Sequence, residues 1–242
     1  MLNERTEGLI NPDLETLNFE PELQINEVNM YIVCADLEGI FVPEVWINVA
    51  EKTGIKELRL TTRDISDYDV LMKKRLSILN ANGLKLKDIT DVIATMEPLD
   101  GALEFLEWLR SEMQLIIVSD TYVEFAKPLM EKLKWPTLFC HSLSVDKRGM
   151  ISGYNLRQKD SKKMTVLSLQ SLNYKVIAIG DSYNDITMLK EADEKILFRP
   201  PDNVKEEFPQ FFVSYGYEEL KTIIQRTLKR DIPCLLTEQK IA

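Results

Sequence analysis

Cysteine, histidine and long apolar runs are scarce in this sequence of 242 residues. The three cysteines, Cys34, Cys140 and Cys234, lie far apart and lack the spacing of metal ligands. An odd number of cysteines without a recognisable signal peptide is typical of a reducing compartment, so we expect a cytoplasmic protein. A membrane-spanning helix needs about 20 apolar residues in a row. No run in the sequence approaches that length, and we expect no membrane partner.

Basic clusters and histidine are scarce as well. The formal net charge is −9, and basic residues gather only in short runs such as Lys159 to Lys163. Nucleic acids and anionic membranes bind basic surfaces, so neither is an expected partner. His141 is the single histidine, which excludes a multi-histidine metal site. Acid–base chemistry is therefore expected from carboxylates.

The composition and the pattern along the chain predict one main domain with a smaller insertion. Hydrophobic residues make up 45% of the sequence, which is enough for a substantial core. Residues 1–29 hold seven acidic residues and one basic residue without a sustained apolar period, so we interpret them as an acidic N-terminal arm or extension. We assign 30–42 and 99–230 to an α/β catalytic core, 43–98 to a helical cap and 231–242 to a C-terminal tail.

Strands alternate with helices in the predicted core. Apolar runs that suit strands buried on both faces occur at 31–35, 115–118 and 176–180. Further elements are expected as strands at 137–140, 195–198 and 211–213, a hairpin over 142–154, and helices at 99–110, 122–134, 161–172 and 217–229. This alternation predicts a doubly wound, Rossmann-like parallel sheet with right-handed crossovers.

Acidic and hydroxyl side chains stand where three of these strands end. Asp36, Ser119 and Asp181 each follow a separate buried run. The carboxyl ends of parallel strands share one edge of the sheet, where ligands bind, so we expect the three side chains to converge. Glu38 lies two residues after Asp36 and can face the same ligand, because side chains two apart on an extended segment point the same way.

A cluster of carboxylates predicts a cation. Asp36, Glu38, Asp181 and Asp185 would repel one another without one, and hard oxygen ligands with no histidine or cysteine nearby favour Mg²⁺. Mg²⁺ sites often hold phosphate oxygens, so a phosphorylated substrate fits. The Ser119 hydroxyl and a lysine from 159–163 would surround the remaining oxygens.

The predicted cap carries a cation on an apolar helix face. Arg75 shares that face with Tyr68 and Leu71, and a buried guanidinium needs a partner. A carboxylate ligand can supply a bidentate one, whereas an internal ion pair with a cap acid such as Asp69 is the structural alternative. Glu44, at the start of the first cap helix, is placed to meet a substrate ammonium.

Four segments in this order resemble the motifs of the haloacid dehalogenase superfamily. They are Asp36-Leu37-Glu38-Gly39, the strand ending in Ser119-Asp120-Thr121, a lysine at a helix start, and the run from Gly180 to Asp185. The resemblance covers residues 30 to about 225 and is to the phosphoserine phosphatase branch. It is closest to members that also act as phosphoserine:homoserine phosphotransferases, which share the Asp-Leu-Glu-Gly opening and the run 157–160.

The resemblance implies a role for each motif residue. Asp36 would be the nucleophile that forms an aspartyl-phosphate, and Glu38 the acid that protonates the leaving oxygen and then activates the acceptor. Mg²⁺ would be held by Asp36, Asp181 and the backbone carbonyl of Glu38. The substrate-binding residues would be Glu44, Arg75, Ser119, Asp120, Lys162 and Asn184, and Asp185 would support the metal ligands.

The sequence leaves two points open, namely the reach of Glu38 and the identity of the phosphate-binding lysine. Most of the superfamily has Asp where this chain has Glu38, so a longer side chain must reach the same oxygen. Three lysines are candidates for the phosphate-binding group. Lys162 is preferred because Val166 and Leu169 follow it at helical spacing, but Lys159 and Lys163 stay open.

The sequence thus predicts an Mg²⁺-dependent phosphoserine phosphatase with water or homoserine as acceptor, serving serine and threonine biosynthesis. A phosphatase of another small phosphorylated metabolite is the nearer alternative. A receiver domain, which is a phosphorylation switch rather than an enzyme, is the more distant one, and it has no helical cap. A homodimer is kept as one possible assembly.

Overall fold

The computed structural model describes residues 30–230 with the exception of 62–63 and 66. The predicted N-terminal arm, the C-terminal tail and Cys234 lie outside the described residues. None of the described helices is both long and apolar enough to cross a lipid bilayer.

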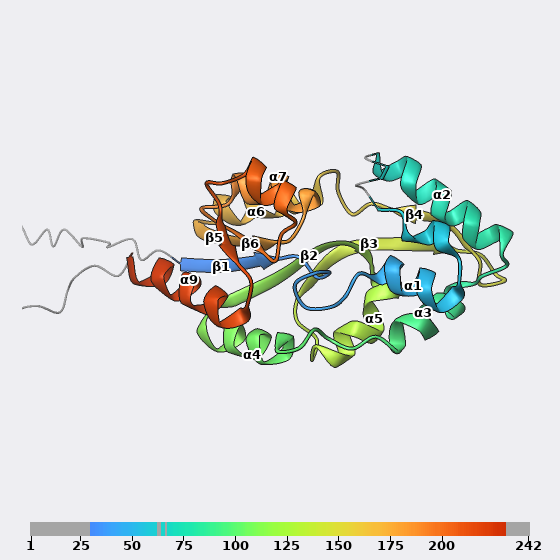
Figure 1. Cartoon of the computed structure of the whole chain (residues 1–242), viewed down its shortest axis with the longest axis horizontal. Helices are drawn as coiled ribbons and strands as arrows, with labels where there is room; N and C mark the ends of the chain where they lie inside the picture. Colours follow the sequence, from blue (N-terminus) through green and yellow to red (C-terminus); the bar gives the residue numbers. More distant parts are fainter. Residues whose placement is uncertain (1–29, 62–63, 66, 231–242) are drawn as a thin grey trace, which may run out of the picture.

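A seven-stranded sheet forms the centre of the protein (Figure 1), in the order β4-β3-β2-β1-β5-β6-β7. All neighbouring strands are parallel except β3 and β4, which form the predicted hairpin. The strands are β1 Met30–Ala35, β2 Gln114–Tyr122, β3 Leu138–Val145, β4 Ile151–Asn155, β5 Tyr174–Gly180, β6 Glu194–Phe198 and β7 Phe212–Ser214. The predicted α/β doubly wound fold is therefore confirmed.

Helices cover both faces of the sheet. Helices α4 Ala102–Glu112, α5 Val123–Lys132 and α9 Tyr217–Arg230 lie on one face, and α6 Ser161–Ser171 and α7 Ile186–Glu191 lie on the other (Figure 1). The alternation of side chains along a strand explains the two layers. Val33 and Ala35 of β1 belong to one buried cluster, and Ile32 and Cys34 belong to the second.

Three further helices lie between β1 and α4, at the end of the molecule opposite α9 (Figure 1). They are α1 Val45–Thr53, α2 Tyr68–Ala81 and α3 Leu86–Ala94, and the short 3₁₀-helix η1 Lys56–Arg59 lies between α1 and α2. We call 45–94 the cap segment. The two chain stems that lead to it are tied together where the Leu99 N–H donates to the Phe41 carbonyl at 2.9 Å.

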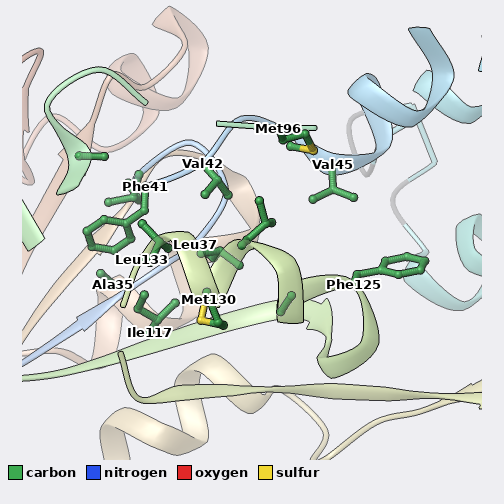
Figure 2. Close-up of a cluster of buried hydrophobic side chains, with 14 of the residues drawn as sticks. Ala35, Leu37, Phe41, Val42, Val45, Met96, Ile117, Phe125, Met130 and Leu133 are labelled. Atoms are coloured by element: carbon green, nitrogen blue, oxygen red, sulfur yellow. The ribbon is translucent and has the colours of Figure 1, made fainter. Parts of the chain in front are cut away.

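The apolar core continues from the sheet into the cap segment. Figure 2 shows Ala35 and Ile117 of the sheet, Met130 of α5 and Val45 of α1 in one cluster of buried side chains. These side chains are at most 3% exposed. Burial of this kind stabilises by about 25 cal/mol for each Å² of apolar surface. The cap segment is therefore packed on the core through α5 as well as connected to it by its stems.

Some predicted boundaries were wrong. Strand β2 continues beyond 118 to Tyr122, and β3 continues beyond 140 to Val145, because both strands go on pairing across the edge where the site lies. Helix α4 begins at Ala102 because Gly101 adopts a left-handed conformation, with a φ of +82°. The sequence analysis did not predict α8 Asp202–Glu207 or the 3₁₀-helix η2 Tyr183–Asp185.

Candidate active site

A cavity of about 310 Å³ opens at the carboxyl ends of β1, β2 and β5, beneath the cap segment. The candidate site residues from the sequence analysis line it, with three exceptions: Asp185 is fully buried behind it, and the alternative lysines Lys159 and Lys163 are not part of the lining. The lining comprises Asp36, Glu38, Glu44, Trp46, Ile47, Thr61, Tyr68, Leu71, Arg75, Ser119, Asp120, Thr121, Lys162, Asp181, Ser182, Tyr183 and Asn184.

Asp36 is the first residue after β1 and is held in one orientation. Its backbone N–H donates to the Ile179 carbonyl at 3.0 Å, which extends the sheet by one hydrogen bond. Its Oδ1 accepts the Leu37 N–H at 2.8 Å. The side chain is nearly buried, with the residue 7% exposed. Burial raises the pKa of Asp36 well above its usual value, and the Lys162 ammonium opposes this shift.

Gly39 lets the segment after β1 approach β5. Its φ is +76°, a conformation that side-chain-bearing residues rarely adopt. A Cβ atom on Gly39 would lie 2.5 Å from Asp181 Oδ2, which is closer than real Cβ contacts. The glycine of the Asp-Leu-Glu-Gly motif is therefore needed for both its backbone conformation and its lack of a side chain.

Lys162 is the centre of an ionic network. Its Nζ lies 2.7 Å from Asp185 Oδ1, 3.1 Å from Asp36 Oδ1 and 3.8 Å from Asp120 Oδ2. Burial would lower the pKa of Lys162, but the carboxylates of Asp185 and Asp36 raise it, so the ammonium stays charged. Of the other two candidate lysines, Lys163 pairs with Glu191 at 2.6 Å and Lys159 does not line the cavity.

Asp185 supports the site from behind. Its Oδ1 accepts a hydrogen bond from Lys162, and its Oδ2 accepts the N–H groups of Asp181 and Ser182 at 2.9 and 3.1 Å. Gly180 leaves the room for this, because a Cβ there would lie 2.3 Å from Asp185 Cβ. With both oxygens engaged, Asp185 is suited to orient neighbours rather than to bind a ligand directly.

The carboxylates form a set that fits Mg²⁺. Oxygens of Asp36, Asp181 and Asp185 all lie within 4.8 Å of one another. Burial and the Asp185 charge raise the pKa of Asp181 to about 7, although the Lys162 ammonium opposes the shift. Because Asp185 is already engaged, Asp36 and Asp181 are the side chains that would hold the cation, and hard oxygen donors are what Mg²⁺ prefers.

Glu38 connects the core to the cap segment. Its Oε2 accepts the Val45 N–H, at the start of α1, at 2.8 Å. The longer side chain therefore reaches the cavity while it caps a helix. Burial and the neighbouring Glu44 raise the pKa of Glu38 to about 8, although the Val45 N–H opposes the shift. A carboxyl group of this kind holds a proton near neutral pH and can donate it.

The bulged end of β2 contributes hydroxyl and carboxylate groups. Ser119 is buried, and its Oγ accepts the Thr121 N–H at 3.2 Å, which leaves its own hydroxyl hydrogen for a ligand oxygen. The Asp120 carboxylate faces Lys162, whereas its carbonyl accepts the Tyr68 hydroxyl at 3.0 Å. Asn184 lines the cavity from the segment after β5.

On the cap segment, Arg75 does not pair with Asp69, the alternative considered from the sequence. Asp69 contacts Lys73 and the Tyr154 hydroxyl. The Arg75 guanidinium instead donates to the Leu60 carbonyl at 2.7 Å and lies 4.5 Å from the centre of the Trp46 ring. Its Nε is buried without a hydrogen-bond partner among the described residues.

Glu44 occupies the N-cap position of α1 rather than its first turn, and it lines the same cavity. Tyr68 and Leu71, which the sequence indicated only as residues of the helix face that carries Arg75, also line the cavity, and so does Trp46 of α1. The position of Tyr68 seven residues before Arg75 places both on one helix face, which is the signal that could have identified it.

Residues 32–193 match the family profile described as haloacid dehalogenase-like hydrolase. The chain is 56% identical over 203 residues to the phosphoserine phosphatase ThrH of Pseudomonas aeruginosa, covering 84% of this chain and 99% of the relative. A phosphoserine phosphatase of Pseudomonas syringae is 55% identical over 208 residues, covering 86% and 88%.

Solved structures show the same fold. A phosphoserine phosphatase carrying a phospho-aspartyl intermediate analogue matches with a TM-score of 0.66 at 19% identity, over 81% of this chain and 99% of that one. A haloacid dehalogenase family hydrolase from Salmonella enterica matches with a TM-score of 0.67 at 20% identity, over 82% and 72%. The hydrolase match and the helices between β1 and α4 argue against the receiver-domain alternative. The chain belongs to the haloacid dehalogenase-like hydrolase family.

Proposed function

We propose that this protein is an Mg²⁺-dependent phosphoserine phosphatase that works through an aspartyl-phosphate on Asp36. The observation that carries the proposal is the single cavity in which Asp36 and Lys162 face Arg75 and Glu44. The first two suit a phosphoryl group, and the other two suit the carboxylate and the ammonium of an amino acid. The similarity to two phosphoserine phosphatases at more than 50% identity supports the same substrate.

The proposed reaction uses Asp36 and Glu38 in turn. The Asp36 carboxylate attacks phosphorus, the bond to the serine oxygen breaks, and Glu38 gives its proton to that oxygen. Glu38 then takes a proton from water as the water oxygen attacks phosphorus, which releases phosphate and restores Asp36. Asp36, Asp181 and the Glu38 carbonyl would hold Mg²⁺, which would supply positive charge that stabilises the phosphoryl group. Lys162 and Ser119 donate to those oxygens, which stabilises charge that develops in the transition state.

Substrate recognition is assigned to Arg75 of the cap segment and to Glu44, the residue directly before that segment. The unpartnered Nε of Arg75 and its planar guanidinium suit a bidentate bond to the serine carboxylate. Glu44 lines the same cavity and suits the ammonium. The stack on Trp46 limits rotation of the guanidinium, so less freedom is lost when the carboxylate binds.

The direct test is hydrolysis of a panel of phosphomonoesters by the purified protein with Mg²⁺, with EDTA, and with EDTA followed by excess Mg²⁺. We expect phosphoserine to have the highest kcat/KM and the activity to be lost and then restored by the metal treatment. A different small phosphometabolite at the top of the panel would replace the substrate assignment. Full activity in EDTA would contradict the role of Mg²⁺.

We further propose that homoserine can replace water as the acceptor. Homoserine has one more methylene than serine and presents the same ammonium and carboxylate to Glu44 and Arg75. A bound and oriented hydroxyl can reach effective molarities of about 10⁵ M, which exceeds the concentration of water. A phosphorus NMR time course with phosphoserine and millimolar homoserine should show O-phosphohomoserine at the expense of phosphate. Phosphate as the only product at saturating homoserine would leave a plain phosphatase.

A further inference from the structure

His141 lies behind the cavity and contacts the site through one carboxylate. It belongs to β3, is paired in register with Tyr122 of β2, and is 5% exposed. Its Nδ1 accepts the Arg157 N–H at 3.1 Å, so the ring proton is on Nε2. Nε2 lies 3.5 Å from Asp120 Oδ1. His141 does not line the cavity.

Asp120 is brought to His141 by an irregularity in the sheet. Strand β2 advances from Val118 to Tyr122 while β3 advances only from Phe139 to His141, so the extra residues of β2 bulge toward the cavity. Bulges of this kind re-aim side chains and are frequent next to active sites. In consequence the two oxygens of Asp120 face opposite partners, His141 on one side and Lys162 on the other.

Lys162 depends on several carboxylates for its position. A lysine side chain has four rotatable carbons and a compact charge, so it has no preferred direction of its own. Asp185 holds its ammonium from behind, and Asp36 and Asp120 hold it from the cavity side. Burial would raise the pKa of Asp120, but Lys162 and the hydrogen bond from His141 lower it below the usual value. The carboxylate is thus ionised and attracts the ammonium.

We propose that His141 and Asp120 form a positioning pair that fixes the Lys162 ammonium beside Asp36. His141 orients the Asp120 carboxylate, and Asp120 in turn stops Lys162 from shifting toward Asp185 and away from the phosphoryl group. His141 is a positioning residue, because it acts only through Asp120. The inference rests on the proposed phosphatase function, and it adds a role for a histidine that the reaction itself does not use.

Two substitutions of His141 separate its two hydrogen bonds. In H141N the amide oxygen can accept the Arg157 N–H, but no donor reaches Asp120. In H141Q the longer amide can place its NH₂ near the former Nε2 and donate to Asp120. A lost hydrogen bond to a charged group reduces an equilibrium by on the order of 10-fold or more. We expect H141N to lower kcat/KM for phosphoserine by about 10-fold, and H141Q to recover most of the loss.

A double-mutant cycle tests whether His141 acts through Asp120. The wild type, H141N, D120A and H141N/D120A are compared by kcat/KM and by the inhibition constant of inorganic phosphate. The inhibition constant measures how tightly the site binds phosphate, separately from the chemical step. In the wild-type background, we expect H141N to lower kcat/KM and to raise the inhibition constant of phosphate. In the D120A background, H141N should change neither quantity by more than about twofold, because the effects of substitutions at two contacting residues are not additive.

S214A is the matched control, because it removes the hydrogen bond from the buried Ser214 hydroxyl to the Gly216 carbonyl, and Ser214 does not line the cavity. It should lower the thermal midpoint without changing kcat/KM. If H141N lowers kcat/KM by the same factor with and without Asp120, the positioning pair is overturned and His141 is structural. The same conclusion follows if H141Q does not recover kcat/KM. If the wild type itself does not hydrolyse phosphoserine, the proposed function fails instead, and phosphate inhibition with the panel's best substrate still decides the pair.

Discussion

On the core side of the cavity, charged side chains already pair with one another, whereas on the cap side the Arg75 guanidinium forms no ion pair with a carboxylate among the described residues. Lys162 contacts three carboxylates, and both oxygens of Asp185 are used. By contrast, the guanidinium of Arg75 donates to the Leu60 carbonyl and to the Met72 sulfur and stacks on Trp46, and its Nε has no hydrogen-bond partner among the described residues. The two sides of one cavity therefore differ in how much hydrogen-bonding capacity they leave for a ligand.

The difference separates chemistry from selection. A buried, internally bonded network holds its atoms in place before the substrate arrives, which is what stabilisation of developing charge requires. An unpartnered buried donor costs free energy until a ligand satisfies it, so it favours the ligand that brings the matching acceptor. Substitutions on the core side should therefore reduce turnover, and substitutions on the cap side should change which substrate is preferred.

The largest effect is expected for Asp36→Asn. The amide keeps the volume and can still accept the Leu37 N–H, but it cannot form the acyl-phosphate. We expect kcat to fall by on the order of 10⁴-fold or more, with little change in the thermal midpoint. Steady-state kinetics and thermal unfolding check this. Turnover within tenfold of the wild type would remove Asp36 as the nucleophile.

Asp181→Ala should break the metal site while leaving the Lys162 network in place. We expect binding of a phosphate mimic such as beryllium fluoride to require both Mg²⁺ and Asp181, with affinity reduced by on the order of 100-fold in the variant. Fluorine NMR of the bound mimic, with and without Mg²⁺, measures this without turnover. Equal binding by the variant would show that Asp181 is not a ligand.

On the cap side, Arg75→Ala should change specificity more than rate. Loss of a charge-assisted hydrogen bond costs about 1.5–3 kcal/mol, so KM for phosphoserine should rise by about 10- to 100-fold. Phosphoethanolamine lacks the carboxylate, and its KM should change little. Arg75→Lys is the matched control, because it keeps the charge but loses the planar fork. An equal loss on both substrates would make Arg75 structural.

The smallest effect is expected where the two sides meet. The Tyr68 hydroxyl donates to the Asp120 carbonyl and shares a 2.7 Å hydrogen bond with the Tyr122 hydroxyl. Tyr68→Phe removes neutral hydrogen bonds worth about 0.5–1.5 kcal/mol each, so kcat/KM should fall by about 3- to 10-fold. The Tyr154 hydroxyl donates to Asp69 and does not line the cavity, so Tyr154→Phe should change kcat/KM by less than about twofold. Similar losses in both variants would contradict a specific link through Asp120.

The sequence by itself determined which strand ends carry the chemistry. Asp36, Ser119 and Asp181 follow buried apolar runs, and parallel strands place such residues at one edge wherever they stand in the chain. The order of the motifs also sufficed to indicate the family. The strand limits at 118 and 140 were set too short, because the apolar run ends there while backbone pairing does not.

Only the tertiary structure decided the contacts that depend on how distant elements pack. It places Lys162, rather than Lys159 or Lys163, against Asp36. The reason is that the packing of α6 against β5 and α7 determines which side of the helix faces the cavity. It gives Arg75 the partners Leu60 and Trp46 instead of Asp69. It also brings His141 to Asp120, because β3 lies beside β2 and a bulge aims the carboxylate. Local sequence patterns specify which residues of an element are buried. Contacts between elements depend instead on strand order, on register and on how the cap segment packs on the core, and no local pattern contains this information.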